Sequence, residues 1–288
     1  MPTLEFSPTL LPAVLALASA ALWGVSDFGG GLLGRRGPIL GVLLATQGVG
    51  FVIAMAGVVV WGEPMLGGND LGLAIAAAGL AAVGVGSLYR GLAVGRMGIV
   101  APVTAVLTAV TPALIGIALE GAPAPIVILG FGIAIVAVVV VSLVSDDASG
   151  HPTGLNYALI GGVTLGLLGV VLTRIGLEHL FVPLAVMRGL EMVLFIAFLS
   201  IRRVPWRMPR GTLPLVVLVG VVDVIGNVAF LTAARTGDLS IAAVLSALYP
   251  VVTVILAGVL LRERVTLSHA AGIALAFVAV VLITGGTT

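Results

Sequence analysis

The sequence predicts an all-α integral membrane protein whose ten transmembrane helices form two inverted five-helix repeats. Hydrophobic residues make up 60% of the 288 residues, and charged residues make up only 9%. The apolar residues fall into ten runs, and a helix needs about 20 such residues to cross a bilayer. The runs divide into two sets of five. An odd number of spans in the first set makes the second set enter the membrane upside down.

The predicted spans follow one another at short intervals. Backbone in lipid must satisfy its own hydrogen bonds, so each span is expected to be helical. The spans are 12–33, 39–61, 70–94, 98–119 and 125–144, then 154–174, 181–201, 213–235, 240–261 and 267–284. No connection is long enough for a soluble domain. We therefore expect a first repeat at 1–144, a linker at 145–153 and a second repeat at 154–288.

Several classes of protein are disfavoured by what the chain lacks. It has no cysteine for a disulfide or a thiolate metal site, and His151, His179 and His269 are far apart in sequence. It contains no phosphate-binding glycine loop followed by Lys, no His-Glu metal motif and no serine nucleophile elbow. The net charge of +1 gives no basic surface for nucleic acid. We therefore expect that the protein is not an enzyme and that it has no cofactor, bound metal or nucleic-acid partner. Residues 1–11 carry no Lys or Arg, so the first span is interpreted as retained structure rather than as a signal peptide.

Short motifs that combine aromatic residues, Pro, Arg and Gly occur in both halves. They are Leu22-Trp23-Gly24, Tyr89-Arg90-Gly91-Leu92-Ala93, Ala101-Pro102-Val103, Tyr249-Pro250, Arg262-Glu263-Arg264 and Gly272. Together they resemble the EamA family of the drug/metabolite transporter superfamily over nearly the whole chain. The resemblance implies two inverted five-helix repeats around a central cavity, without fixing a substrate. The first half departs from the pattern, because Thr111-Pro112 is followed by Glu120 and then by no Arg.

Glycine and proline have two interpretations each. The chain has 40 glycines, and pairs such as Gly30/Gly34 and Gly162/Gly166 have the four-residue spacing of one helix face. They indicate either close helix packing or hinges for alternating access. Tyr249-Pro250 is predicted near the middle of the ninth span. Proline there would either simply kink the helix or free a carbonyl toward a cavity.

Charged residues inside the spans carry most of the functional information. Five ionisable residues fall within the predicted spans, not counting the first and last residue of each span: Asp27, Arg90, Arg188, Glu191 and Asp223. Ionisable groups at membrane depth are costly and usually face a cavity or a partner. Arg188 and Glu191 are three residues apart, so they are expected to pair along one helix. Asp223 and Asn227 are four apart and are expected to share a face.

The acids outnumber the bases in this set by three to two. An unpaired charge in a low-dielectric interior becomes neutral or finds a partner. The three carboxylates are therefore candidates for coupling transport to protons or for binding a cationic group, and a purely structural role is the alternative. Asp223 is the first choice for the coupling group, because its own helix offers it no Arg.

Aromatic residues complete the set of candidate site residues. Trp23 lies four residues before Asp27, on the same helix face, and an aromatic ring beside an acid can bind a cation. Packing is the alternative role for Trp23. Tyr89 and Tyr249 are further candidates for the wall of a cavity. Arg90 is expected either to pair with Asp27 or a substrate carboxylate, or to extend to the membrane interface.

These features predict a secondary transporter that moves a small metabolite across the cell (inner or plasma) membrane by alternating access. The substrate class is an amino acid, amine or related compound, and proton coupling and export are options. A lipid-linked substrate flippase and a non-transporting receptor or assembly subunit are the alternatives. Both a monomer and a homodimer are compatible with the sequence.

The distribution of arginine predicts the orientation in the membrane. Odd-numbered connections hold nine arginines: Arg35, Arg36, Arg96, Arg202, Arg203, Arg207, Arg210, Arg262 and Arg264. Even-numbered connections hold two, Arg174 and Arg235. Positive charge marks the cytoplasmic side, so we expect both termini outside. Relatives in the superfamily are often drawn the other way round.

Overall fold

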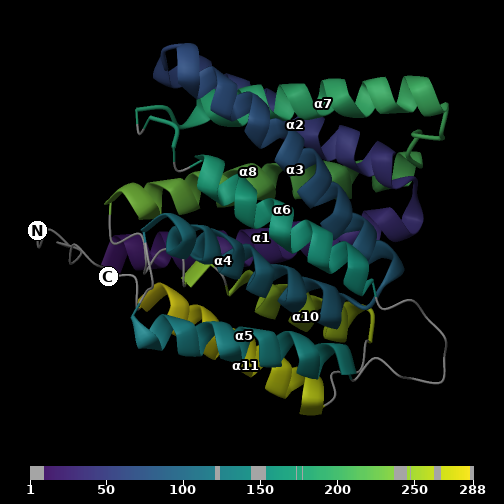
Figure 1. Ribbon diagram of the computed structural model, residues 1–288. Helices are drawn as coiled ribbons and strands as arrows, with labels where there is room; N and C mark the ends of the chain where they lie inside the picture. Colours follow the sequence, from purple (N-terminus) through teal and green to yellow (C-terminus); the bar gives the residue numbers. More distant parts are fainter. Residues whose placement is uncertain are drawn as a thin grey trace, which may run out of the picture.

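The computed structural model describes residues 10–120, 124–143, 154–172, 174–176, 178–236, 245–246, 248–262 and 267–285, and within these ranges it contains helices and no strand. The helices are α1 (Leu10–Arg36), α2 (Ile39–Trp61), α3 (Gly68–Val94), α4 (Met97–Glu120), α5 (Pro125–Leu143), α6 (Leu155–Leu172), α7 (Phe181–Arg202), the 3-10 helix η1 (Arg210–Thr212), α8 (Leu213–Thr236), α10 (Tyr249–Leu260) and α11 (Leu267–Gly285). Figure 1 shows α2 and α7 together at one side of the bundle, with α5 and α11 together at the other.

The helices coincide with the predicted spans. Six described helices are long and apolar enough to cross a membrane, namely α1, α2, α3, α6, α7 and α8. The expectation of a multi-pass helical membrane protein is confirmed at this level.

The ninth predicted span, 240–261, differs from the structure in one respect. Its helix α10 begins at Tyr249, and Pro250 lies in the first turn. Proline is well tolerated there, because the missing N–H would have no partner inside the helix. Whether the span is kinked at this proline stays a prediction, because the residues just before it are only partly described. Residues 237–244 and 247 lie outside the described part of the chain.

Helices from the two halves pack against each other throughout the bundle. Helix α1 packs on α8 and α10, while α6 packs on α3 and α4. Glycine makes the closest approaches possible: a Cβ atom at Gly162 would lie 2.5 Å from Leu107 Cβ, and one at Gly166 would lie 2.5 Å from Thr111 Cβ. The packing interpretation is confirmed for this pair.

The two ends of the bundle differ in charge. At one end Arg35 donates a hydrogen bond of 3.1 Å to the carbonyl of Gly95, which joins the first and third connections. A Cβ atom at Gly37 would lie 2.8 Å from Met208 Sδ, so the seventh connection lies at the same end. At the opposite end of α2, Glu63 accepts hydrogen bonds from the backbone at the start of α7. Arginine thus gathers at the end formed by these odd-numbered connections.

Candidate functional site

A buried arginine joins three helices near the middle of their lengths. The Arg188 side chain on α7 is only 2% exposed. Its guanidinium donates hydrogen bonds to Gln47 Oε1 on α2 and to Asp223 Oδ2 on α8. Gln47 Nε2 in turn donates to Glu191 Oε2 on α7 at 2.7 Å. We call Gln47, Arg188, Glu191 and Asp223 the polar network.

The pairing inside the network differs from the expectation. Arg188 and Glu191 do share one face of α7, but no ion pair within 4.0 Å joins them in the described structure. The charged partner of Arg188 is Asp223, so the arginine that Asp223 lacks on its own helix comes from α7. Gln47 lies between Arg188 and Glu191 and bridges them, because its amide both accepts and donates.

The space for the guanidinium comes from a glycine. A Cβ atom at Gly50 would lie 2.5 Å from Arg188 Nη1. Gly50 is three residues after Gln47, so both face Arg188 from the same side of α2. Sequence reasoning missed these two residues. The signal for Gln47 was present, since it is an amide in the middle of a run that is otherwise almost entirely apolar.

Asp223 is the most exposed residue of the polar network. Its side chain is 29% exposed, whereas that of Arg188 is 2% exposed. Asn227 Nδ2 donates to the Asp223 carbonyl at 2.8 Å and approaches Asp223 Oδ2 at 3.4 Å. The expected shared face of Asp223 and Asn227 is therefore confirmed.

One face of α1 lines the same region. Trp23 contacts two rings from other helices: Phe230 on α8 at a centroid distance of 5.4 Å, and Tyr249 on α10 at 6.4 Å in an edge-on arrangement. One turn along α1, Ser26 Oγ and Tyr89 Oη share a hydrogen bond of 3.2 Å. Of the aromatic candidates, Trp23 thus lies on α1, and Tyr89 and Tyr249 contact side chains of α1.

Asp27 lies on this face at the level of Asp223. Helices α1 and α8 run antiparallel: Trp23 lies against Gly226, whereas Gly29 lies against Val219. Asp27 falls between these contacts, and the two carboxylates interact electrostatically. Asp27 is half-buried. Within the described structure it makes no hydrogen bond and no ion pair.

Arg90 is not brought to the polar network. It follows the buried Tyr89 on α3, and its side chain is exposed. Consecutive helical residues are about 100° apart around the axis, so an inward Tyr89 directs Arg90 outward. The expected pairing with Asp27 is not observed.

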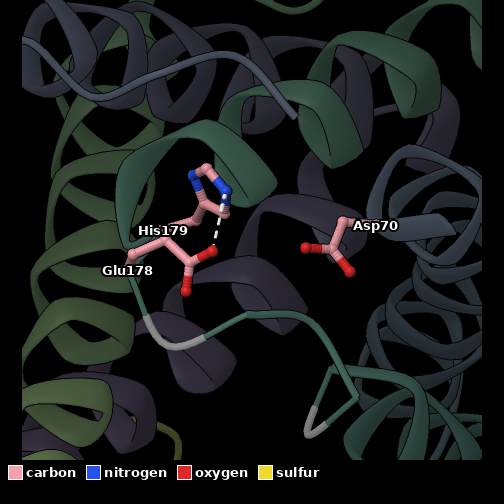
Figure 2. Close-up of side chains that lie close together, drawn as sticks. All are labelled: Asp70, Glu178 and His179. Carbon is pink, nitrogen blue, oxygen red and sulfur yellow. Dashed lines mark ion pairs between the residues drawn. The ribbon is translucent and has the colours of Figure 1, made fainter. Parts of the chain in front are cut away.

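A second cluster lies at the opposite end of α3, away from Tyr89. Asp70 on α3, Glu178 and His179 bring their ligand atoms within 4.8 Å of one another (Figure 2). Glu178 Oε1 lies 3.7 Å from His179 Nε2, and Asp70 Oδ2 accepts a hydrogen bond of 3.3 Å from the Gly176 amide. Carboxylate and imidazole are donors that a divalent metal accepts. Sequence reasoning compared the histidines only with one another, so it did not find this grouping. The hydrogen bond to Gly176 gives Asp70 a structural role in attaching the α6–α7 connection to α3.

The family of the second half follows from comparison with known proteins. Residues 152–285 match the model of the EamA-like transporter family. The predicted resemblance to EamA proteins is thus confirmed over this region. The family consists of membrane transporters of small compounds rather than enzymes.

Solved structures extend the comparison to the whole chain. One, described only as the crystal structure of a protein, has a TM-score of 0.62 and 18% sequence identity, covering 96% of this chain and 96% of its own. At this identity the match shows a shared fold. A comparison with curated proteins found no match.

The polar network draws on both halves of the chain. The EamA-like half contributes Arg188, Glu191 and Asp223, with Asn227 beside them. The preceding half contributes Gln47 by direct hydrogen bonds, and Asp27 lies close by. A change in the packing of the two halves would therefore alter the network itself.

Proposed function

We propose that this protein is a secondary transporter that moves a small metabolite, an amino acid, amine or related compound, across the cell membrane by alternating access. The observation that carries the proposal is the polar network. An arginine, two carboxylates and an amide lie near the middle of apolar helices α2, α7 and α8. Ionisable groups at membrane depth are costly and mark substrate or ion pathways.

The architecture we propose has ten transmembrane helices in two inverted repeats, 1–144 and 154–288. The helix contacts support it when α1 to α5 are matched in order with α6, α7, α8, α10 and α11. Under this exchange the α1–α8 contact becomes α6–α3, and α1–α10 becomes α6–α4. The α2–α8 contact becomes α7–α3. Each of these contacts is present, as expected for two halves related by a pseudo-two-fold axis.

The coupling step we propose is protonation of Asp223. Asp223 is the most exposed acid of the polar network, so solvent reaches it more readily than it reaches Glu191. A proton on Asp223 removes the charge opposite Arg188. The guanidinium then keeps Glu191 as its charged neighbour, and the contact between α7 and α8 loosens. Alternation between the paired and the unpaired state of Arg188 and Asp223 would then open the site first to one side of the membrane and then to the other.

The orientation we propose places the arginine-rich end in the cytoplasm. Arg35 and Arg96 lie in connections that meet at that end, and positive charge is retained on the cytoplasmic side. Both termini are then outside.

The test is flux into reconstituted vesicles. A panel of radiolabelled amino acids and amines is offered with and without a pH gradient. We expect at least one compound to accumulate with the gradient in the parent protein. Asp223→Asn should lose gradient-driven accumulation while retaining exchange of the same compound. Asp70→Asn, at the far end of α3, is the matched control and should behave as the parent. An unchanged response of Asp223→Asn to the gradient would remove Asp223 from the coupling step.

A further inference from the structure

We infer that the substrate carries an ammonium group that binds at Asp27, with an apolar or aromatic body against Trp23, Phe230 and Tyr249. The inference rests on the proposed transport function, because it assigns the substrate class of the same site. It depends on three observations: the charge balance, the aromatic rings beside Asp27, and the engagement of Arg188.

The charge balance around the polar network favours a cation. Arg188 is held by Asp223 directly and is linked to Glu191 through Gln47. Asp27 is a third carboxylate, and it interacts with Asp223 by charge repulsion. The charge of Arg188 acts on Asp223 and Glu191, so Asp27 has no cationic partner in the described structure, and Arg90 is exposed. A carboxylate in such a place becomes neutral or finds a cationic partner, and an ammonium group would be such a partner.

Asp27 has a carboxylate that no hydrogen bond or ion pair of the described structure engages. Its side chain is half-buried rather than sealed. By contrast, Glu191 is fully buried and hydrogen-bonded to Gln47. Among the three acids, Asp27 is the one that an external ammonium group can reach without breaking an existing pair.

Aromatic rings lie beside this carboxylate. Trp23 is one turn before Asp27 on α1, so the ring and the carboxylate lie on one face. Trp23 meets Tyr249 edge-on at 6.4 Å and Phe230 at 5.4 Å. A Cβ atom at Gly226 would lie 2.8 Å from Trp23 Cδ1, so glycine makes room for the indole. Ring faces attract cations within about 6 Å, and ring surface also packs against an apolar body.

Arg188 is poorly placed to bind an anionic substrate instead. Its two terminal nitrogens already donate to Gln47 and Asp223. Its Nε has no hydrogen-bond partner in the described structure, but that atom is completely buried. A substrate carboxylate would have to displace Asp223 and would add negative charge beside three acids. The site therefore selects against anions.

The experiment measures equilibrium binding by the fluorescence of Trp23. Trp61 and Trp206 are 69% and 51% exposed, so both are replaced by Phe, which leaves Trp23 as the reporter in the full-length protein. The probes share a phenyl ring and differ in charge: phenethylamine, 2-phenylethanol and phenylacetate. We expect saturable binding of phenethylamine, and at least tenfold weaker binding of the alcohol and the acid. This comparison needs no change at Asp27.

Variants then assign the charge recognition to Asp27. Asp27→Asn should weaken phenethylamine binding at least tenfold, Asp27→Glu should restore part of it, and Asp70→Asn should bind as the parent. Binding of phenylacetate or 2-phenylethanol as tight as that of phenethylamine would overturn the inference. Unchanged phenethylamine binding by folded Asp27→Asn would overturn it as well.

The binding assay separates this inference from the proposed function. Amine binding by a protein that moves no compound across vesicles would contradict transport alone. Gradient-driven flux of neutral or anionic compounds without amine binding would contradict the substrate class alone.

Discussion

Gln47 on α2 donates a hydrogen bond of 2.7 Å to Glu191 on α7, while its amide oxygen accepts from Arg188. One uncharged side chain thus lies between two buried ionisable groups and is hydrogen-bonded to both. The bond also joins the first half of the chain to the EamA-like half. Any rearrangement that moves α2 away from α7 has to break it.

Replacing Gln47 tests this bridge. Gln47→Leu keeps the approximate volume but leaves the Arg188 and Glu191 groups without the amide. Hydrogen bonds to charged groups contribute about 1.5–3 kcal/mol each, so we expect a clear fall in the thermal unfolding temperature of the purified protein. Thr46→Val, at the adjacent residue on α2, is the control, because the hydrogen bonds of the Thr46 hydroxyl in the described structure stay within its own helix. Equal unfolding temperatures for the two variants would argue against the bridge.

Gly50 and Gly48 form a matched pair on α2. A Cβ atom at Gly50 would lie 2.5 Å from Arg188 Nη1, whereas one at Gly48 would meet Met192 Cε at 3.6 Å, an ordinary contact. Gly50→Ala should therefore displace the guanidinium and destabilise the protein by about 1–3 kcal/mol. Gly48→Ala should be close to neutral. Thermal unfolding of both variants makes the comparison, and the prediction fails if Gly48→Ala is the more damaging change.

The two arginines inside the predicted spans should respond differently to lysine. Lysine keeps the charge but lacks the planar fork that reaches two acceptors at once. Arg188 uses that fork for Gln47 and Asp223, so Arg188→Lys should lower the unfolding temperature. Arg90 is exposed, so Arg90→Lys should leave the unfolding temperature and vesicle flux unchanged. A loss of flux in Arg90→Lys would show instead that Arg90 contributes to transport.

Glu63 caps the start of α7 from the α2–α3 connection. Its carboxylate accepts from the amides of Leu180 at 3.1 Å, Phe181 at 2.8 Å and Val182 at 2.9 Å. Loss of a helix cap costs about 0.5–2 kcal/mol, so Glu63→Ala should speed hydrogen exchange at these amides. Glu178→Ala, where the side chain is 67% exposed, is the control. Unchanged exchange in Glu63→Ala would show that the amides are protected in another way.

The absence of cysteine from the chain makes orientation easy to measure. Glu178→Cys and Arg207→Cys each place one thiol at an exposed position, at opposite ends of the bundle. A membrane-impermeant maleimide applied to intact cells should label Glu178→Cys and spare Arg207→Cys, because the arginine-rich end is expected inside. Both should react after solubilisation. The reverse pattern in intact cells would place the termini in the cytoplasm.

Much of the fold was predictable because a bilayer acts on each segment separately. A run of about 20 apolar residues is driven into lipid whatever its neighbours are, so the apolar runs located the helices before any packing was considered. In the ninth span, the described helix α10 begins only at Tyr249, nine residues after the predicted start at 240. Charges in lipid are costly one at a time. The sequence alone therefore singled out Asp27, Arg188 and Asp223.

Only the tertiary structure decided which of these groups meet. Helices that are apolar on nearly every face carry little periodic signal about their rotation, so the sequence paired Arg188 with its helical neighbour Glu191. Helix packing instead turns Arg188 toward Asp223 on α8 and places Gln47 between Arg188 and Glu191. The same packing presses Tyr89 against α1 and leaves Arg90 outside. The residue types of the candidate site were thus set by the cost of burying charge, and their partners by which helix faces come into contact.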